Sequence, residues 1–189
     1  GFHVALRASM ALEPGLVART LSRIPVVAVA SPAYLKEFGT PTSVKDLRKH
    51  KCILGYVRGE SPETHWPLMD GSKVHVTPSL VSNDLDLRAF AARTGLGITL
   101  LPIPAVVEAL QRAELVPVLE GILGAEARLA VVYAEREFIP PQVRAFVDAL
   151  IAWAPGHLRQ DVVQSCQKER HKALPKPETP EKKLRAKRS

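Results

Sequence analysis

Residues 25–30 constrain the fold more than any other segment, because six apolar residues in a row lead directly into a helix start signal. An uninterrupted apolar run of this length is typical of a strand that is covered on both faces of its sheet. Ser31 and Pro32 then supply a helix N-cap and a proline for the first turn, and Gly39 ends the helix. A buried strand that runs into a helix predicts an α/β fold.

The same alternation of apolar runs and helix signals continues through most of the chain. Further strands are expected at residues 2–6, 16–21, 52–56, 79–81, 97–101, 115–119 and 128–133, with a hairpin over 65–76 that turns at Asp70 and Gly71. Further helices are expected at residues 43–50, 85–95, 104–112 and 141–153, the first opened by a capping box of Ser43 and Asp46 and the last ended by Pro155 and Gly156. Because helices separate most of the strands, we expect mostly parallel pairing.

The basic charge of the chain is concentrated at its C-terminal end. The sequence holds 26 basic and 19 acidic residues, of which nine basic and three acidic ones fall within 168–189, leaving 17 and 16 for the rest. The body is therefore nearly neutral, and its charge says nothing about a ligand. Residues 156–189 are expected to form a basic disordered tail, which either contacts DNA phosphates or only aids solubility.

Several function classes lack their usual signatures. Cys52 and Cys166 have no CxxC or CxxH spacing, and the six histidines are scattered, so we expect no disulfide, metal site or cofactor. The sequence has no GxSxG, HExxH, Walker or GxGxxG motif, which argues against an enzyme. No apolar run reaches a membrane-spanning length and no signal-peptide pattern is visible, so a cytoplasmic location is expected.

Seven segments, in order and at their spacings, resemble the effector-binding domain of LysR-type transcriptional regulators. They are HVALR at 3–7, VAVASPAYL at 27–35, DLRKHKCI at 46–53, WPL at 66–68, SNDLDLRAFAARTGLGITLLP at 82–102, ELVPVL at 114–119, and LAVVYA with PPQVRAFVDAL within 129–150. No single piece is specific, but seven in register make a strong joint signal.

The resemblance implies a two-lobed α/β sensing domain of the type 2 periplasmic-binding-protein-like class, with its first lobe incomplete. Residues 1–29 and 130–155 would form the partial first lobe and 30–129 the second, with crossover strands at 27–31 and 129–131. The family's N-terminal helix-turn-helix, linker helix and first strand-helix-strand have no counterpart in this sequence, so we expect an N-terminally truncated regulator. A small-molecule effector would bind between the lobes, the complete protein would be a dimer or tetramer, and DNA would be contacted only through the missing helix-turn-helix, with no membrane partner.

The resemblance also implies site residues, chosen at strand ends, helix N-termini and pocket walls. The expected effector contacts are Arg7, Ser31, His65, Trp66, Asn83, Asp84, Ile98 and Leu129. The helix over 83–94 would join the dimer interface through Leu85, Arg88, Ala89 and Ala92. Seven of the eight effector contacts have a plainer interpretation: Ser31, Asn83 and Asp84 as helix caps, Arg7 as a solvated strand end, and Trp66, Ile98 and Leu129 as core.

Three other functions remain open at this point. The chain could be a stand-alone solute-binding protein, although no signal peptide is visible. It could be a non-functional fragment, or a small transferase or hydrolase that uses His65 or Asp84 as a base.

Overall fold

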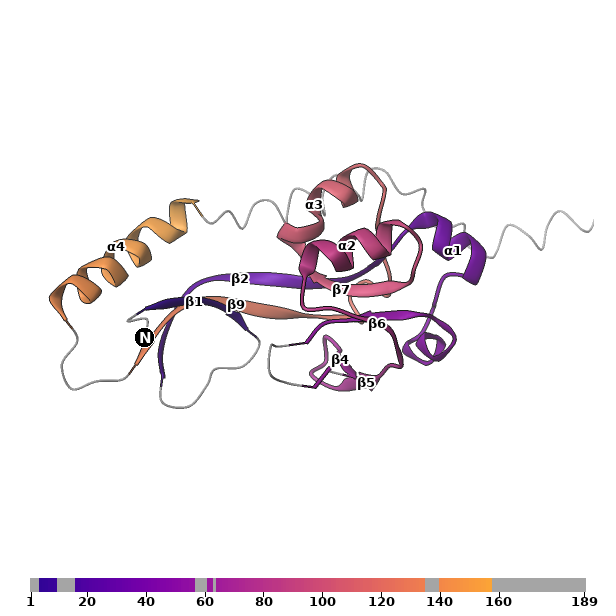
Figure 1. The fold of residues 1–189 in the computed structure, drawn as a ribbon, viewed down its shortest axis with the longest axis horizontal. Coiled ribbons are helices and arrows are strands. Elements are labelled where there is room, and N and C mark those ends of the chain that lie inside the picture. Colours follow the sequence, from indigo (N-terminus) through magenta and orange to yellow (C-terminus); the bar gives the residue numbers. More distant parts are fainter. Residues whose placement is uncertain (1–3, 10–15, 57–60, 63, 135–139, 158–189) are drawn as a thin grey trace, which may run out of the picture.

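Two long strands, β2 (Leu16–Ala30) and β9 (Gly124–Ala134), pair antiparallel from Leu16 opposite Ala134 to Val27 opposite Gly124. In the computed structural model they run from the end of the molecule covered by α4 (Pro141–His157) to the end where α1, α2 and α3 lie (Figure 1). The structure describes residues 4–9, 16–56, 61–62, 64–134 and 140–157. The predicted tail beyond residue 157 lies outside these ranges.

The described strands form a seven-stranded sheet and a separate hairpin. The sheet order is β1-β9-β2-β7-β3-β6, with β8 paired to β2. Its remaining strands are β1 (Ala5–Ser9), β3 (Cys52–Leu54), β6 (Pro78–Val81), β7 (Ile98–Pro102) and β8 (Val116–Pro117). The hairpin of β4 (His65–Pro67) and β5 (Lys73–His75) confirms the turn predicted at Asp70 and Gly71.

The prediction of mostly parallel pairing is wrong. Strand β2 pairs antiparallel with β7, β8 and β9, and β1 pairs antiparallel with β9, whereas only the β3–β6 and β3–β7 pairs among the described strands are parallel. An apolar run indicates that a strand is covered on both faces, and this cover exists in antiparallel sheets as well when helices lie on them. The apolar run at residues 25–30 therefore does not predict whether the strand pairs parallel or antiparallel with its neighbours.

The two strands predicted at 16–21 and 25–30 are one strand. A β-bulge between Thr20 and Ser22 lies just before residues 22–24, which the prediction left between the two strands. Beyond the bulge, Nη1 of Arg23 on β2 lies 2.8 Å from Oε2 of Glu126 on β9 in an exposed ion pair between the two strands.

The predicted helices are present with small differences. They are α1 (Pro32–Phe38), the 3-10 helix η1 (Val44–Lys49) with its Ser43–Asp46 capping box, α2 (Leu85–Arg93), α3 (Ile103–Gln111) and α4. Helix α4 continues to His157 through Pro155, where we expected it to end. Its Val147 and Ala154 are buried, but Phe146 and Trp153 are exposed, so only part of the predicted apolar stripe contacts the sheet.

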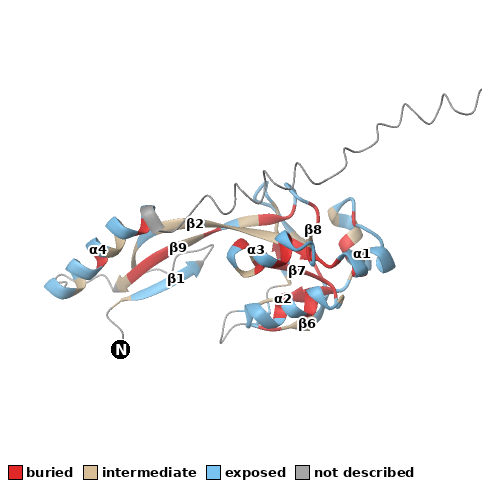
Figure 2. Cartoon of the chain, turned by 90° about the horizontal axis from the view of Figure 1, so that it is seen from above, coloured by how far each residue is buried: buried red, intermediate tan, exposed pale blue. Residues whose placement is uncertain are grey.

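The core lies mainly where α1, α2 and α3 cover the sheet (Figure 2). One buried cluster includes Tyr34, Trp66 and Ile98, and the other includes Ile53, Leu101 and the inner faces of α2 and α3. Residues of β3, β6 and β7 contribute to both clusters. The division into lobes at 29/30 and 129/130 stays a prediction.

Candidate functional site

The parallel strands β3, β6 and β7 end at one edge of the sheet, where α2 begins. Strand β2 runs antiparallel to β7, with Val26 opposite Pro102, so the N-terminal half of β2, beside α4, lies beyond this edge. Open α/β sheets bind ligands at the carboxyl ends of parallel strands. We call the group formed there by Gly55, Ser82, Asp84 and Arg88 the carboxyl edge.

The start of α2 is fixed by two polar side chains of this group. Oδ1 of Asp84 accepts the backbone N–H groups of Asp86 at 2.8 Å and Leu87 at 3.0 Å, which is the geometry of an N-cap. Oγ of Ser82 accepts the N–H of Asp84 at 3.1 Å, and the N–H of Ser82 donates to the carbonyl of Leu54 at 3.0 Å. The Asp84 carboxylate is thus engaged with its own helix.

Arg88 extends from α2 beneath the ends of β3 and β7 and is only 9% exposed. Its Nη2 donates to the carbonyl of Leu100 and lies 3.4 Å from Oγ1 of Thr99, which itself donates to the carbonyl of Ile53 at 3.0 Å. No carboxylate of a described residue contacts the guanidinium, and Nε finds no acceptor among these residues. Burial lowers the pKa of Arg88 below its usual range.

Gly55 leaves the space that Arg88 occupies. A Cβ at residue 55 would overlap Nη1 of Arg88 and would lie 3.1 Å from Cζ. The glycine, which directly follows β3, was not identified as a site residue from the sequence. The sequence feature that could have identified it is a glycine at the end of a fully buried strand. Glycine at such a place often marks a close approach between the backbone and another group.

Two of the predicted effector contacts lie at the opposite end of β7. Val29 of β2 pairs with Thr99, so Ser31 lies beyond the start of β7, next to Ile98 and about 17 Å along the strand from Val26. Both Ser31 and Ile98 are fully buried, and Oγ of Ser31 accepts the N–H of Tyr34 at 3.3 Å as the cap of α1. The structure therefore does not bring them together with Asp84.

The other predicted contacts are dispersed. Trp66 is buried in the core, whereas His65 is exposed, with its ring centroid 5.2 Å from that of His75 across the hairpin. Arg7 is exposed on β1 opposite Ala130, and Leu129 is half-buried on β9. Asn83 is exposed just before the Asp84 cap. Of the eight predicted residues, only Asn83 and Asp84 lie beside the carboxyl edge.

Helix α2 presents a different face to solvent from the one expected. Arg88, Ala89 and Ala92, predicted for a dimer interface, are buried against the chain's own sheet and α3, whereas Leu85 is exposed. The exposed face also carries Leu87 and Phe90, the latter 53% exposed. The apolar pattern did not decide between the faces because small or apolar residues lie on both.

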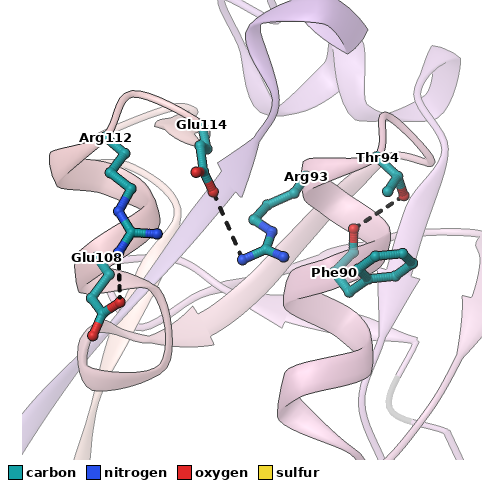
Figure 3. Close-up of polar contacts among 6 residues, drawn as sticks. All are labelled: Phe90, Arg93, Thr94, Glu108, Arg112 and Glu114. Atoms are coloured by element: carbon teal, nitrogen blue, oxygen red, sulfur yellow. Dashed lines mark hydrogen bonds and ion pairs between the residues drawn. The ribbon is translucent and has the colours of Figure 1, made fainter.

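One ion pair links the C-terminal end of α2 to the segment that follows α3 (Figure 3). Nη1 of Arg93 lies 3.7 Å from Oε2 of Glu114, just beyond α3, and Oγ1 of Thr94 donates to the carbonyl of Phe90 at 3.0 Å. Arg112 and Glu108 pair along α3 with 3.3 Å between Nη2 and Oε2. Because both ion pairs are exposed, they contribute little stability. Neither pair covers the Phe90 ring, which is exposed to solvent.

A hollow that the sequence did not indicate lies between α4 and the long strands. It has a volume of about 270 Å³ and is lined by Arg19, Tyr133, Arg144, Val147 and Asp148. Within the described ranges, no three His, Cys, Asp or Glu residues are grouped as metal ligands would be. No helix in this part of the chain is long and apolar enough to cross a membrane.

Comparison with known proteins gives consistent matches. The family model for the LysR substrate binding domain matches residues 1–155. The probable HTH-type transcriptional regulator LtrA of Klebsiella pneumoniae is 33% identical over 163 residues, covering 82% of this chain and 52% of LtrA. The chain spans about half the length of the curated relatives it matches.

Solved structures give the same result for the fold. The regulatory domain of CrgA, a LysR-type transcriptional regulator from Neisseria meningitidis, is 27% identical with a TM-score of 0.63, covering 80% of this chain and 74% of that domain. Full-length AphB, a virulence activator of Vibrio cholerae, is 28% identical with a TM-score of 0.65, covering 81% of this chain and 52% of AphB. The predicted regulatory-domain fold is confirmed by these likenesses.

Proposed function

Because the chain belongs to the LysR substrate binding domain family, we propose that it binds a small-molecule effector and thereby controls DNA-dependent transcription. The match over residues 1–155 is the observation that carries the proposal. The carboxyl edge supports it, since it combines a helix N-terminus, strand ends and a buried cation in one place.

The mechanism would be a difference in affinity between two conformations of the domain. An effector that binds one arrangement of the sheet edge more tightly shifts the population toward that arrangement. Coupling to DNA then needs a partner surface that differs between the two conformations. DNA itself would be contacted by a helix-turn-helix of the longer protein, working in the cytoplasm.

A second copy of this protein would pair through the outer face of α2. Leu85, Leu87 and Phe90 form the exposed apolar part of that helix, and family members act as oligomers. Of the four interface residues expected from the sequence, this proposal retains Leu85. It omits Arg88, Ala89 and Ala92, because they are already buried within the chain's own core.

The relatives matched are transcriptional regulators and not enzymes. A role for Asp84 as a general base would also require its carboxylate to leave the two N–H groups that it caps. No described feature favours the stand-alone solute-binding or fragment interpretation over a regulator.

The test is a thermal-shift screen of the chain against a library of small metabolites, followed by calorimetry of any compound that raises the melting temperature. At least one compound should bind with 1:1 stoichiometry. If no compound in a chemically broad library binds, the proposed function is wrong.

A further inference from the structure

Buried polar groups are concentrated at the end of β3. Four polar or charged side chains among the described residues are buried: Ser31, Ser82, Arg88 and Thr99. Three of these surround residues 53–55, since Thr99 donates to the carbonyl of Ile53, Ser82 donates its N–H to Leu54, and Arg88 lies against Gly55. Arg88 alone among the four carries a charge.

A buried guanidinium without a counter-charge is energetically unfavourable. Moving a cation out of water is costly unless a carboxylate or another anion compensates it. Arg88 has two neutral acceptors, the Leu100 carbonyl and the Thr99 hydroxyl. Both accept hydrogen bonds from the same nitrogen, Nη2. Nη1 and Nε donate to no described residue, so the charge is buried with much of its donor capacity unused.

Ser82 offers a second unused donor in the same place. Its Oγ accepts the N–H of Asp84, and its own hydroxyl hydrogen has no acceptor among the described residues. Both Ser82 and Arg88 flank the Leu54–Gly55 peptide at the carboxyl ends of β3 and β6. A positive charge and a neutral donor, both nine-tenths buried, form a site that is complementary to an anion.

We propose that the carboxyl edge binds the carboxylate group of an organic acid, which accepts hydrogen bonds from Arg88 and Ser82. The proposal rests on the effector-binding function above and names the chemical class of the effector. One guanidinium matches a single negative charge, and the Asp84 carboxylate at the start of α2 disfavours a dianion such as phosphate. Charge-assisted hydrogen bonds in a desolvated site are strong enough to select an acid over its neutral amide.

Gly55 provides a way to test the site without removing its charge. An alanine there would displace only the far end of the Arg88 side chain, because the atoms nearest to the added Cβ all belong to that guanidinium. Gly55→Ala should therefore fold normally and yet move the cation away from its place against the end of β3.

The experiment measures binding of acetate, benzoate and butyrate to the 189-residue chain by calorimetry, with acetamide, benzamide and butyramide as neutral partners. All solutions have the same ionic strength, so nonspecific attraction of the acids to the basic chain is screened equally in the wild type and the variants. The variants are Arg88→Met, Gly55→Ala and Ser82→Ala, with Arg112→Met as the control because Arg112 is an exposed arginine on α3.

At least one acid should bind more tightly than its amide. Arg88→Met and Gly55→Ala should each weaken that acid at least about tenfold, Ser82→Ala about fivefold, and the Arg112 control should change nothing. Arg88→Met should melt at the wild-type temperature or above, since it removes an uncompensated charge.

Two results would overturn the assignment. Equal binding of acids and amides would do so, as would undiminished acid binding in both Arg88→Met and Gly55→Ala. If neutral metabolites from the library bind while all three acids fail, the carboxylate assignment is wrong and the regulator function stands. If nothing binds at all, both are wrong.

Discussion

The hydroxyl oxygen of Tyr34 lies 3.1 Å from Nδ1 of His50. The same hydroxyl accepts the backbone N–H of Lys51 at 2.8 Å, and it donates its own hydrogen to His50 when the neutral ring carries its hydrogen on Nε2. Burial raises the pKa of Tyr34 and lowers that of His50, which keeps both groups uncharged at neutral pH. This short chain joins α1 to the start of β3.

Replacing Tyr34 with phenylalanine should destabilise the protein by about 2 kcal/mol, because the Lys51 N–H and His50 lose their partner inside the structure. Urea unfolding followed by circular dichroism measures the effect. Tyr56→Phe, at an exposed residue, is the matched control and should stay within about 0.5 kcal/mol of the wild type. Equal losses in the two variants would contradict this role of the hydroxyl.

The stability should fall as the pH drops below 6.5. The pKa of His50 is lowered in the folded state by burial, so the unfolded chain binds more protons once the pH passes below the ordinary value of 6.5. Asp46, whose pKa is lowered chiefly by its hydrogen bond from the Ser43 hydroxyl, loses its contribution only as the pH falls through 3.8 and below. We therefore expect the change between pH 7 and 5 to depend on His50.

The measurement is the urea midpoint at several pH values between 5 and 8. His50→Gln should remove most of the decrease, whereas His75→Gln, at an exposed residue, should keep it. A decrease that is identical in the two variants would show that another group is responsible.

Gly97→Ala should destabilise the fold by about 3 kcal/mol. Gly97 has a φ of +152°, and a Cβ there would overlap the carbonyl oxygen of Lys51, which accepts the N–H of Ile98. Gly71→Ala, at a positive φ but in open space, should cost about 1 kcal/mol and serves as the control. Chemical unfolding of the three proteins measures both values, and a Gly97 loss no larger than the control would refute the overlap.

Cys52 should be unreactive in the folded protein. Burial raises the pKa of its thiol to about 12, so almost no thiolate is present at pH 8. In a Cys166→Ser background, labelling with Ellman's reagent should be fast only in denaturant. Rapid labelling of the native chain would show that the thiol is accessible.

Phe90→Asp should weaken self-association at least about tenfold, because it places a charge on the exposed apolar face of α2. Sedimentation equilibrium of the chain measures the dissociation constant. Ile122→Asp, at an exposed residue outside α2, is the control. If both variants associate as the wild type does, α2 is not the interface.

The sequence predicted the elements better than their arrangement. Ser31 as a cap, the Ser43–Asp46 box and the Asp70–Gly71 hairpin depend on local chemistry, and all three are confirmed. The single strand through residues 16–30 was missed, because its bulge is stabilised by pairing with β9, about a hundred residues away along the chain.

The candidate site was predicted only in part. Asp84 was found because capping is a local pattern, whereas the sequence did not show that Ser31 and Asp84 lie at opposite ends of β7, since that depends on the direction of β2. The role of Ser31 as an effector contact stays a prediction. Arg88 was named with a different role, because a charged residue is expected at the surface. Arg88 is buried because α2 turns this residue toward the sheet and because Gly55 has no side chain in the space that the guanidinium occupies. The hydropathy pattern of the sequence shows neither of these features.

Helix α2 carries Arg88 on its inner face and Phe90 on its outer face. A helix moves largely as a rigid rod, so any ligand that draws Arg88 toward itself rotates or shifts Phe90 by a comparable amount. The path between ligand and neighbouring subunit would then be one helix diameter, about 10 Å. Sensitivity to an effector would then depend mainly on how strongly the Asp84 cap fixes the N-terminal end of α2, because the Arg93–Glu114 contact at its other end is exposed and weak.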